Sequence, residues 1–263
     1  MDIAEALLLG VVQGLTEWLP VSSSGHLVIA QELLGLSAEK HLLFDLMVHL
    51  GTVLAVCVYF RRELLGIVKA MLSTRGHGDR DEKLRMLGFM ILLGTIPIAV
   101  VGLTLSENIE EAFTVRMVGI ALIVNAIVLV VAERMASAGA KRAIRPVDAL
   151  IVGLFQAAAI IPGISRSGFS ISGGLFRGIE REVAATFAFL LSAPSLLGAF
   201  AYGAITLDAH DTDFGMMMIG LVSAFAVGIV AIDFLLKAIR AGKLWIFGVY
   251  CLALGALALA MTL

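Results

Sequence analysis

The sequence contains few charged residues. Asp, Glu, Lys and Arg make up 15% of its 263 residues, whereas 60% are hydrophobic and the mean hydropathy is +1.00. A soluble domain of this size needs more polar side chains to cover its surface, so the composition excludes that class. Cysteine is also scarce. Cys57 and Cys251 both lie in apolar runs, which indicates small hydrophobic side chains rather than a disulfide or a metal site.

What the chain has instead is a series of apolar stretches. A helix needs about twenty residues to cross a bilayer, and we predict six such helices, at 43–60, 86–105, 115–133, 183–205, 215–236 and 244–262. Two further apolar segments, 2–36 and 147–180, are broken in the middle by Pro, Gly and Ser, and their halves are too short to span. We predict that each forms a re-entrant helical hairpin, whose turn must be buried in protein or line a wet cavity. The predicted fold class is therefore an all-α polytopic membrane protein.

A shift of 143 residues superposes the two halves of the chain. It places Gly10 on Gly153, Gln13 on Gln156, Ser22 on Ser165, Ser24 on Ser167, Gly25 on Gly168 and Phe44 on Phe187. The repeats, about 1–135 and 146–263, each contain one hairpin and three spans within a single membrane domain, 1–263. Because three is odd, we predict an inverted-topology repeat, in which the two turns meet near the midplane. The alternative is chance similarity between apolar helices that contain Gly and Ser.

The basic residues predict the orientation of the chain in the membrane. Sixteen of the 19 Lys and Arg residues fall within 61–85, 134–145, 177–181 and 237–243. The alternate connections, 106–114 and 206–213, contain Asp and Glu but neither Lys nor Arg. By the positive-inside rule, the basic connections are cytoplasmic. The first hairpin then enters from outside, so we expect the site at its turn to open to the outer side of the membrane.

Polar residues gather at the two predicted turns. Gln13 and Glu17 are four residues apart, so they share one helix face, and Ser22, Ser23, Ser24 and His26 follow Pro20. The second turn contains Ser165, Arg166, Ser167, Gly168 and Ser170. Serines at a helix N-terminus bring hydroxyl donors, free backbone N–H groups and the positive end of a dipole. Together with the planar fork of an Arg, they predict an anion site suited to phosphate.

Each polar residue also has a structural interpretation. The serines could simply cap helices, Glu17 and Arg166 could form a buried ion pair, and His26 could be a core histidine. Asp45 and His49, which are four residues apart, are expected to pair with each other at the outer end of the first full span. A transporter for a lipid phosphate or another anion, with the same repeat and no hydrolysis, is the competing function.

At these turns the sequence resembles the bacterial undecaprenyl-diphosphate phosphatase family, also called bacitracin-resistance proteins. One family motif, Glu or Gln, then Glu, then Pro-Val-Ser-Ser-x-Gly-His, matches Gln13, Glu17 and Pro20 through His26. The other, Pro-Gly-x-Ser-Arg-Ser-Gly, matches Pro162 through Gly168. The resemblance covers essentially the whole chain. It implies hydrolysis of a C55 polyprenyl diphosphate to the monophosphate, which recycles the carrier lipid of cell-wall synthesis, and resistance to bacitracin, which sequesters the diphosphate.

The resemblance and the residue types suggest the same roles. Arg166, with Ser165, Ser167 and neighbouring groups of the two turns, is expected to hold the diphosphate. Glu17 is expected to bind a divalent cation, Mg²⁺ or Ca²⁺, or to activate the nucleophile. Ser23 and His26 are the two candidates for the nucleophile, and His26 is alternatively a general acid. Gln13 stands where many members have Glu, so the metal is expected to be weakly held, and Ser170 stands where Thr is common. The resemblance also implies a protein of the bacterial inner membrane whose active site faces the periplasm. We expect the lipid substrate and the bilayer as partners and no nucleic acid; a homodimer stays open.

Overall fold

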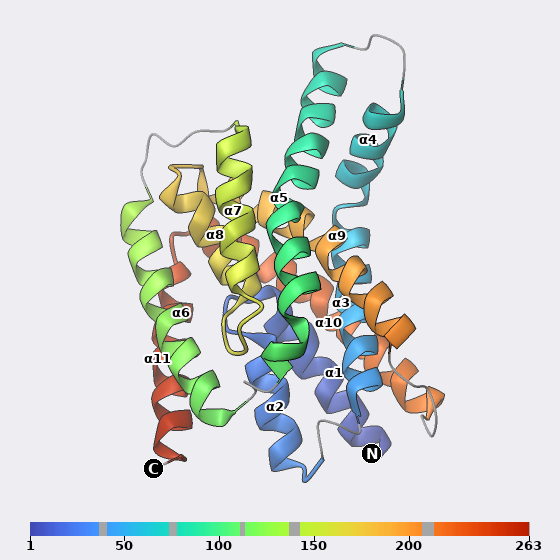
Figure 1. Cartoon of the computed structure of the whole chain (residues 1–263), viewed down its shortest axis with the longest axis vertical. Helices are drawn as coiled ribbons and strands as arrows, with labels where there is room; N and C mark the ends of the chain where they lie inside the picture. Colours follow the sequence, from blue (N-terminus) through green and yellow to red (C-terminus); the bar gives the residue numbers. More distant parts are fainter. Residues whose placement is uncertain (37–40, 74–77, 111–113, 137–142, 207–212, 263) are drawn as a thin grey trace.

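The computed structural model describes residues 1–36, 41–73, 78–110, 114–136, 143–206 and 213–262, with side chains for all of these except 105–110. The described residues form eleven α-helices, and the predicted all-α class is confirmed (Figure 1). The helices are α1 (Ile3–Trp18), α2 (Ser23–Leu33), α3 (Leu42–Tyr59), α4 (Arg61–Leu72), α5 (Asp79–Glu110), α6 (Val115–Met135), α7 (Pro146–Ala158), α8 (Arg166–Phe176), α9 (Arg181–Thr206), α10 (Phe214–Arg240) and α11 (Leu244–Ala260).

Five of the described helices, α3, α5, α6, α9 and α10, are long and apolar enough to cross a bilayer. The protein is therefore a polytopic membrane protein, as predicted. These helices match the expected segments within a few residues, with one exception. The helix α5 begins seven residues early, at Asp79, because charged turns precede its apolar part. The remaining predicted span, 244–262, is a shorter apolar helix of 17 residues, α11.

The basic connection 61–85 contains a helix that the sequence analysis missed. Figure 1 shows that α4 and the start of α5 project together beyond the rest of the bundle. Ile67 and Ala70 are buried where α4 packs on α5, and Arg85 donates hydrogen bonds to the carbonyl oxygens of Ala70 (3.0 Å) and Ser73 (2.8 Å). The arginine thus satisfies carbonyls that a helix C-terminus leaves free. This packing stabilises a helix that is too short and too charged to be recognised as a span.

Two pairs of short helices form the predicted broken segments. The first pair, α1 and α2, has 16 and 11 residues, and the second, α7 and α8, has 13 and 11. The helix α1 ends at Trp18, shortly before Pro20, because a proline cannot continue a helix. Ser22 caps α2 by accepting a hydrogen bond from the N–H of Gly25 (3.3 Å), and Ser165 caps α8 by accepting one from Gly168 (3.2 Å). The capping interpretation of these two serines is confirmed.

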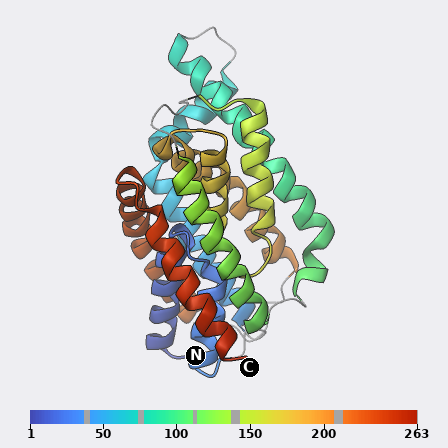
Figure 2. The same ribbon diagram turned by 90° about the vertical axis from the view of Figure 1, so that its left-hand side faces the viewer.

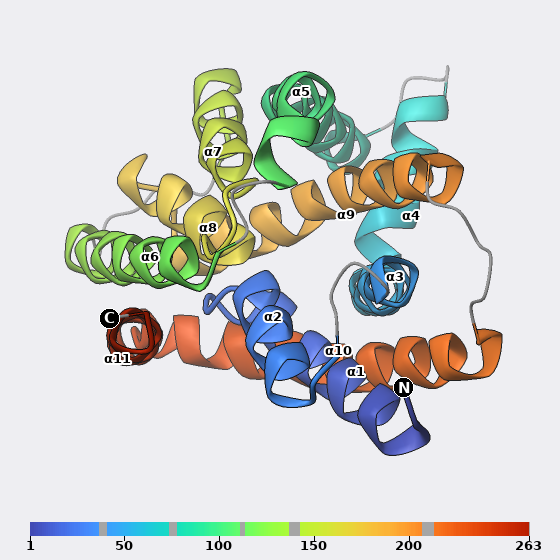
Figure 3. The same cartoon turned by 60° about the horizontal axis from the view of Figure 1, so that its bottom comes forward.

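Glycines allow close contacts between helices of different parts of the chain. A Cβ added at Gly10 of α1 would lie 2.5 Å from the carbonyl oxygen of Gly220 in α10, and one at Gly153 of α7 would overlap the carbonyl of Gly94 in α5. Helix backbones that approach so closely are typical of membrane proteins. As a result α1 lies along α10 and α7 along α5, with α2 and α8 inside the bundle (Figure 3).

The helices α6 and α11 run side by side in opposite directions (Figure 2). A Cβ at Gly255 would lie 2.8 Å from the carbonyl oxygen of Gly119, and one at Gly248 would lie 3.1 Å from that of Ala126. At the far end, the N–H of Leu244 donates to Glu133 Oε2 (3.0 Å). The helix α11 therefore accompanies α6 over nearly its whole length. Both ends of the chain lie at the end of the bundle opposite to α4 (Figure 1).

Candidate active site

The end of α1 presents a buried carboxylate. Glu17 is 6% exposed and Gln13, one turn earlier on the same face, is fully buried. Glu17 Oε2 accepts a hydrogen bond from Gln13 Nε2 (2.9 Å) and another from the hydroxyl of Ser23 (2.6 Å), at the start of α2. The predicted common face of Gln13 and Glu17 is confirmed. The two hydrogen bonds fix the carboxylate and hold the serine hydroxyl against it.

The second turn brings Arg166 to this carboxylate. Arg166 is the first residue of α8, and its Nη1 lies 3.6 Å from Glu17 Oε1. Within the described part of the chain, Arg166 Nε and Nη1 have no hydrogen-bond partner, although both are buried. The two turns also touch directly, because Ser167 donates to the carbonyl oxygen of Leu19 (3.2 Å). Segments almost 150 residues apart thus form one site, with guanidinium donors left for a ligand.

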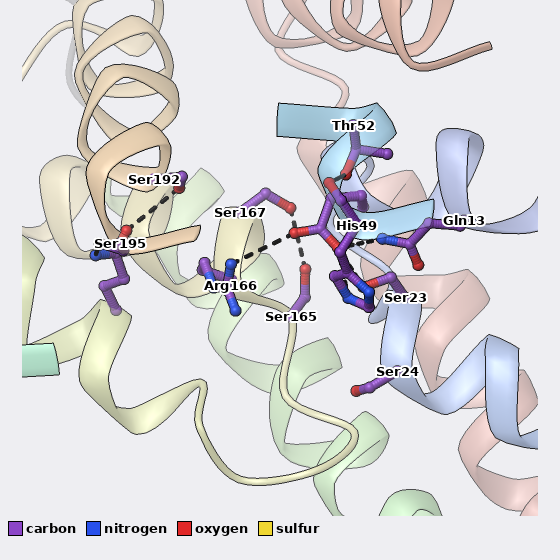
Figure 4. Close-up of polar contacts among 12 residues, drawn as sticks. Gln13, Ser23, Ser24, His49, Thr52, Ser165, Arg166, Ser167, Ser192 and Ser195 are labelled. Atoms are coloured by element: carbon purple, nitrogen blue, oxygen red, sulfur yellow. Dashed lines mark hydrogen bonds and ion pairs between the residues drawn. The ribbon is translucent and has the colours of Figure 1, made fainter. Parts of the chain in front are cut away.

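A cavity of about 170 Å³ lies between the two turns. Its polar lining consists of Glu17, Ser23, Ser24, His49, Ser165 and Arg166, and its apolar lining comes mainly from the 159–164 connection. Figure 4 shows Ser23 and His49 on one side of this space and Arg166 on the other. Its size suits a polar head group rather than a whole lipid. A larger cavity of about 420 Å³, between α5 and α9, contains none of the predicted site residues.

His49 is a site residue that the sequence analysis did not select. It lies on α3, and its Nε2 is 3.7 Å from Glu17 Oε2. Its Nδ1 lies 2.7 Å from the backbone carbonyl oxygen of Asp45, whereas the Asp45 carboxylate accepts hydrogen bonds from Gln31 Nε2. Because a carbonyl oxygen only accepts, Nδ1 carries a proton and Nε2 is free to face the cavity. The available signal was an ionisable side chain within a predicted span.

His26 does not line the cavity. Its Nδ1 lies 2.7 Å from the carbonyl oxygen of Ser22 and its Nε2 lies 2.7 Å from the hydroxyl of Tyr250 on α11. The structure therefore brings Glu17, Ser23 and Arg166 together and directs His26 elsewhere.

The other predicted residues surround the turns. Ser22 and Ser165 are the caps described above, and each hydroxyl also contacts that of the serine two residues later, at 3.4 Å for Ser24 and 3.1 Å for Ser167. Gly168 contributes its backbone N–H to the cap of α8. Ser170 is fully buried, and its hydroxyl has no hydrogen-bond partner in the described part of the chain.

The protein alone offers few ligands for a metal ion. Among the described residues, no group of three or more His, Cys, Asp and Glu side chains is placed to hold one. Glu17 Oε2 already accepts two hydrogen bonds, while Oε1 faces the guanidinium of Arg166 without a hydrogen bond. Mg²⁺ is commonly bound by one or two carboxylates, water and the phosphates of a substrate. The donor set fits a cation that binds together with a phosphorylated ligand.

Known proteins resemble this chain over nearly its full length. The sequence pattern of the family described as bacitracin resistance protein BacA matches residues 6–257. A protein of Korarchaeum cryptofilum named undecaprenyl-diphosphatase is 43% identical over 261 residues, which are 97% of each chain. Proteins of the same name from Carboxydothermus hydrogenoformans and Methanosphaera stadtmanae are 41% identical (97% of this chain, 95% of the relative) and 36% identical (100% and 99%). With this match and these identities, the chain belongs to the BacA family of bacitracin resistance proteins.

Proposed function

We propose that this protein is an undecaprenyl-diphosphatase, which hydrolyses undecaprenyl diphosphate to undecaprenyl phosphate and inorganic phosphate. The relatives bear the name of this activity. The observation that carries the proposal is the meeting of Glu17, Ser23 and Arg166 at one cavity. Because hydrolysis removes the diphosphate lipid, the activity accounts for the bacitracin resistance in the family name.

The second turn supplies the anion-binding half of the site. Among the described residues, Arg166 Nε and Nη1 lack hydrogen-bond partners, and both are buried, where a charged phosphate oxygen gains most from such donors. The N-termini of α2 and α8 add the positive ends of two helix dipoles. These groups hold the diphosphate and stabilise the charge that develops as the anhydride bond breaks.

The first turn supplies the nucleophile and its base. Ser23 already donates its proton toward Glu17 at 2.6 Å, so of the two candidate nucleophiles Ser23 is favoured over His26. The Ser23 oxygen attacks the terminal phosphorus while Glu17 accepts the hydroxyl proton, and the phosphoric anhydride bond breaks to release undecaprenyl phosphate. Glu17 then gives this proton to the departing oxygen of undecaprenyl phosphate, which restores the carboxylate. In the second step Glu17 removes a proton from water as the water attacks the phosphoserine, and the proton passes to the Ser23 oxygen as inorganic phosphate leaves. His49, at 3.7 Å from Glu17, is placed to assist these proton transfers.

A transporter would bind the same head group but would not cleave it. Purified protein in detergent has no second compartment, so release of phosphate from undecaprenyl diphosphate there tests hydrolysis alone. We expect steady turnover, and binding without any phosphate release would favour the transporter.

A divalent cation, Mg²⁺ or Ca²⁺, completes the site in this proposal, held weakly by Glu17 and the substrate. When bound, such an ion offsets the repulsion between a carboxylate and a diphosphate in a medium of low dielectric. We expect excess chelator to lower turnover at least about tenfold, on the scale of the transition-state charge that a bound ion stabilises, and added Mg²⁺ to restore it. Full activity in chelator would contradict the cation requirement.

The membrane architecture follows from the same proposal. We infer six transmembrane helices, with α11 as the sixth, because it accompanies α6 over nearly its whole length and 17 residues lie at the lower limit for a crossing. The pairs α1–α2 and α7–α8 are re-entrant hairpins, since helices of 11 to 16 residues do not span comfortably. The whole chain, 1–263, is one membrane domain.

The packing supports an inverted repeat of about 1–135 and 146–263. Gly10 and Gly153, equivalent under the 143-residue shift, each pack on a glycine of a long helix in the other half, Gly220 and Gly94. Under the same shift, Ile160, Arg166 and Ser192 are the equivalents of Glu17, Ser23 and His49. The repeats have thus diverged: one contributes the base and the nucleophile, and the other contributes the anion-binding arginine.

We propose that the site opens to the periplasmic side, because the basic connections place α4 and the ends of α8 and α10 in the cytoplasm. With these connections in the cytoplasm, the hairpin that contains Glu17 and Ser23 enters from outside. Parts of the loops in this charge pattern lie outside the described residues: 74–77, 111–113, 137–142 and 207–212.

A water-soluble, short-chain prenyl diphosphate that cannot cross membranes tests this orientation in sealed vesicles. Right-side-out vesicles are expected to hydrolyse it, and inside-out vesicles only after detergent is added. The reverse pattern would mean that the site opens inward or that the topology is inverted. Single-cysteine labelling at Ser73 and Ser106, after replacement of Cys57 and Cys251, distinguishes the two.

A further inference from the structure

Both ring nitrogens of His26 are occupied by partners within the protein. Nδ1 faces a carbonyl oxygen, that of Ser22, so Nδ1 carries the proton and donates it. Nε2 then accepts from the hydroxyl of Tyr250 at 2.7 Å, and the two rings are stacked, with centroids 5.6 Å apart and an interplanar angle of 9°. This leaves His26 no free nitrogen for a substrate proton. Its contacts instead connect α11 to the turn that precedes Ser23.

That turn has an unusual backbone. Ser22 has φ 72°, and within the described residues it alone among non-glycine residues has a positive φ. Such a conformation is disfavoured for a residue with a Cβ and persists only where neighbouring contacts maintain it. Ser22 directly precedes Ser23, so the backbone of Ser22 determines whether the Ser23 hydroxyl reaches Glu17.

The second turn provides an internal comparison. Ser165, the repeat equivalent of Ser22, has an ordinary φ of −78°. The residue that corresponds to His26 under the 143-residue shift is Phe169, which can make no such hydrogen bonds. The turn with the disfavoured backbone has the hydrogen-bonding side chain, and the relaxed turn has an apolar one.

We propose that Tyr250 is a positioning residue for the reaction. Its hydroxyl fixes the orientation of His26, whose Nδ1–H holds the carbonyl of Ser22 and thereby keeps Ser23 against Glu17. The inference rests on the proposed hydrolysis, and it assigns to His26 a structural task in place of proton transfer. It also gives α11 a part in catalysis, although this helix contributes no residue to the cavity.

The substitution Tyr250→Phe removes only the hydroxyl and retains the stacked ring. We expect kcat to fall about tenfold, the scale of one lost hydrogen bond, while KM changes less than about twofold because Arg166 is untouched. Tyr202→Phe on α9, whose side chain is 51% exposed, is the matched control and is expected to behave as the wild type. Equal kcat values for Tyr250→Phe and the control would overturn the proposal.

A second substitution separates positioning from chemistry. Glycine adopts a positive φ without strain, so in a Ser22→Gly background the hydrogen bonds from Tyr250 through His26 are less necessary to maintain the turn. The effect of Tyr250→Phe on kcat, measured relative to Ser22→Gly alone, is expected to shrink to less than about threefold. An undiminished effect of about tenfold would show that the Tyr250–His26 pair does not act through the Ser22 backbone, which contradicts the proposal.

Alkylation of a cysteine at position 23 reports on the placement of this residue and does not require catalysis. The protein for this test has the substitution Ser23→Cys and lacks Cys57 and Cys251, so the thiol at position 23 is its single reactive group. Tyr250→Phe is expected to change the rate at which this thiol reacts with a small alkylating reagent at least about threefold, because residue 23 is no longer fixed. Identical alkylation rates with and without Tyr250→Phe would contradict the positioning role of Tyr250, even if the wild type released no phosphate. Absence of phosphate release from the wild type contradicts the proposed function alone, so the two failures remain distinct.

Discussion

Replacement of Arg166 by Ala is expected to lower kcat/KM for undecaprenyl diphosphate by about two to three orders of magnitude, the scale observed when one donor to developing charge is lost. The reason is that Arg166 is the cation that the described residues place at the cavity, with two buried donors free for the diphosphate. The measurement is phosphate release by purified protein in detergent.

Two further arginine variants sharpen this prediction. Arg166→Lys retains the charge but not the planar fork that donates two parallel hydrogen bonds, so its activity is expected to lie between those of Ala and the wild type. Arg240→Ala removes an arginine whose exposed ion pair with Glu182 involves no residue of the cavity lining, and it should leave turnover unchanged. If Arg166→Ala kept activity within about threefold of Arg240→Ala, the anion site would have to lie elsewhere.

The substitution Ser23→Ala is expected to lower kcat at least about a thousandfold, as removal of a nucleophile generally does. Glu17 loses one of its two hydrogen-bond donors, but Gln13 still holds the carboxylate, so the fold should survive. Ser24→Ala, at the same cavity but with its hydroxyl directed to Ser22 at 3.4 Å, should lose much less activity. Comparable losses in the two variants would indicate a general disturbance of the turn and not the loss of a nucleophile.

Local interactions made much of the site predictable. Two residues four apart on a helix share a face, which placed Gln13 beside Glu17. Capping was the structural interpretation of the serines, and the structure confirms it for Ser22 and Ser165. The prediction that the two turns meet is confirmed, since Arg166 reaches Glu17 from almost 150 residues away. Each of these inferences depended on spacing along the chain or on the predicted repeat.

Interactions set by helix packing could not be predicted in the same way. His49 faces Glu17 only because α3 packs with that face toward α1, and one sequence does not reveal such a rotation. His26 is adjacent to the motif serines, yet its ring turns toward Tyr250, 224 residues later. The helix α4 was missed for a related reason, because its burial against α5 is a tertiary contact. Sequence proximity was therefore a poor guide to which histidine reaches the cavity.

The stereochemistry of phosphate release tests the central claim most directly. The substrate is an undecaprenyl diphosphate analogue whose terminal phosphorus carries sulfur, ¹⁶O and ¹⁸O in a defined configuration. The purified protein hydrolyses it in detergent, in water enriched in ¹⁷O. Attack by Ser23 followed by attack of water makes two in-line displacements, each of which inverts the phosphorus centre. The account therefore predicts released thiophosphate with net retention of configuration. Net inversion would mean a single direct attack by water and would contradict Ser23 as the nucleophile.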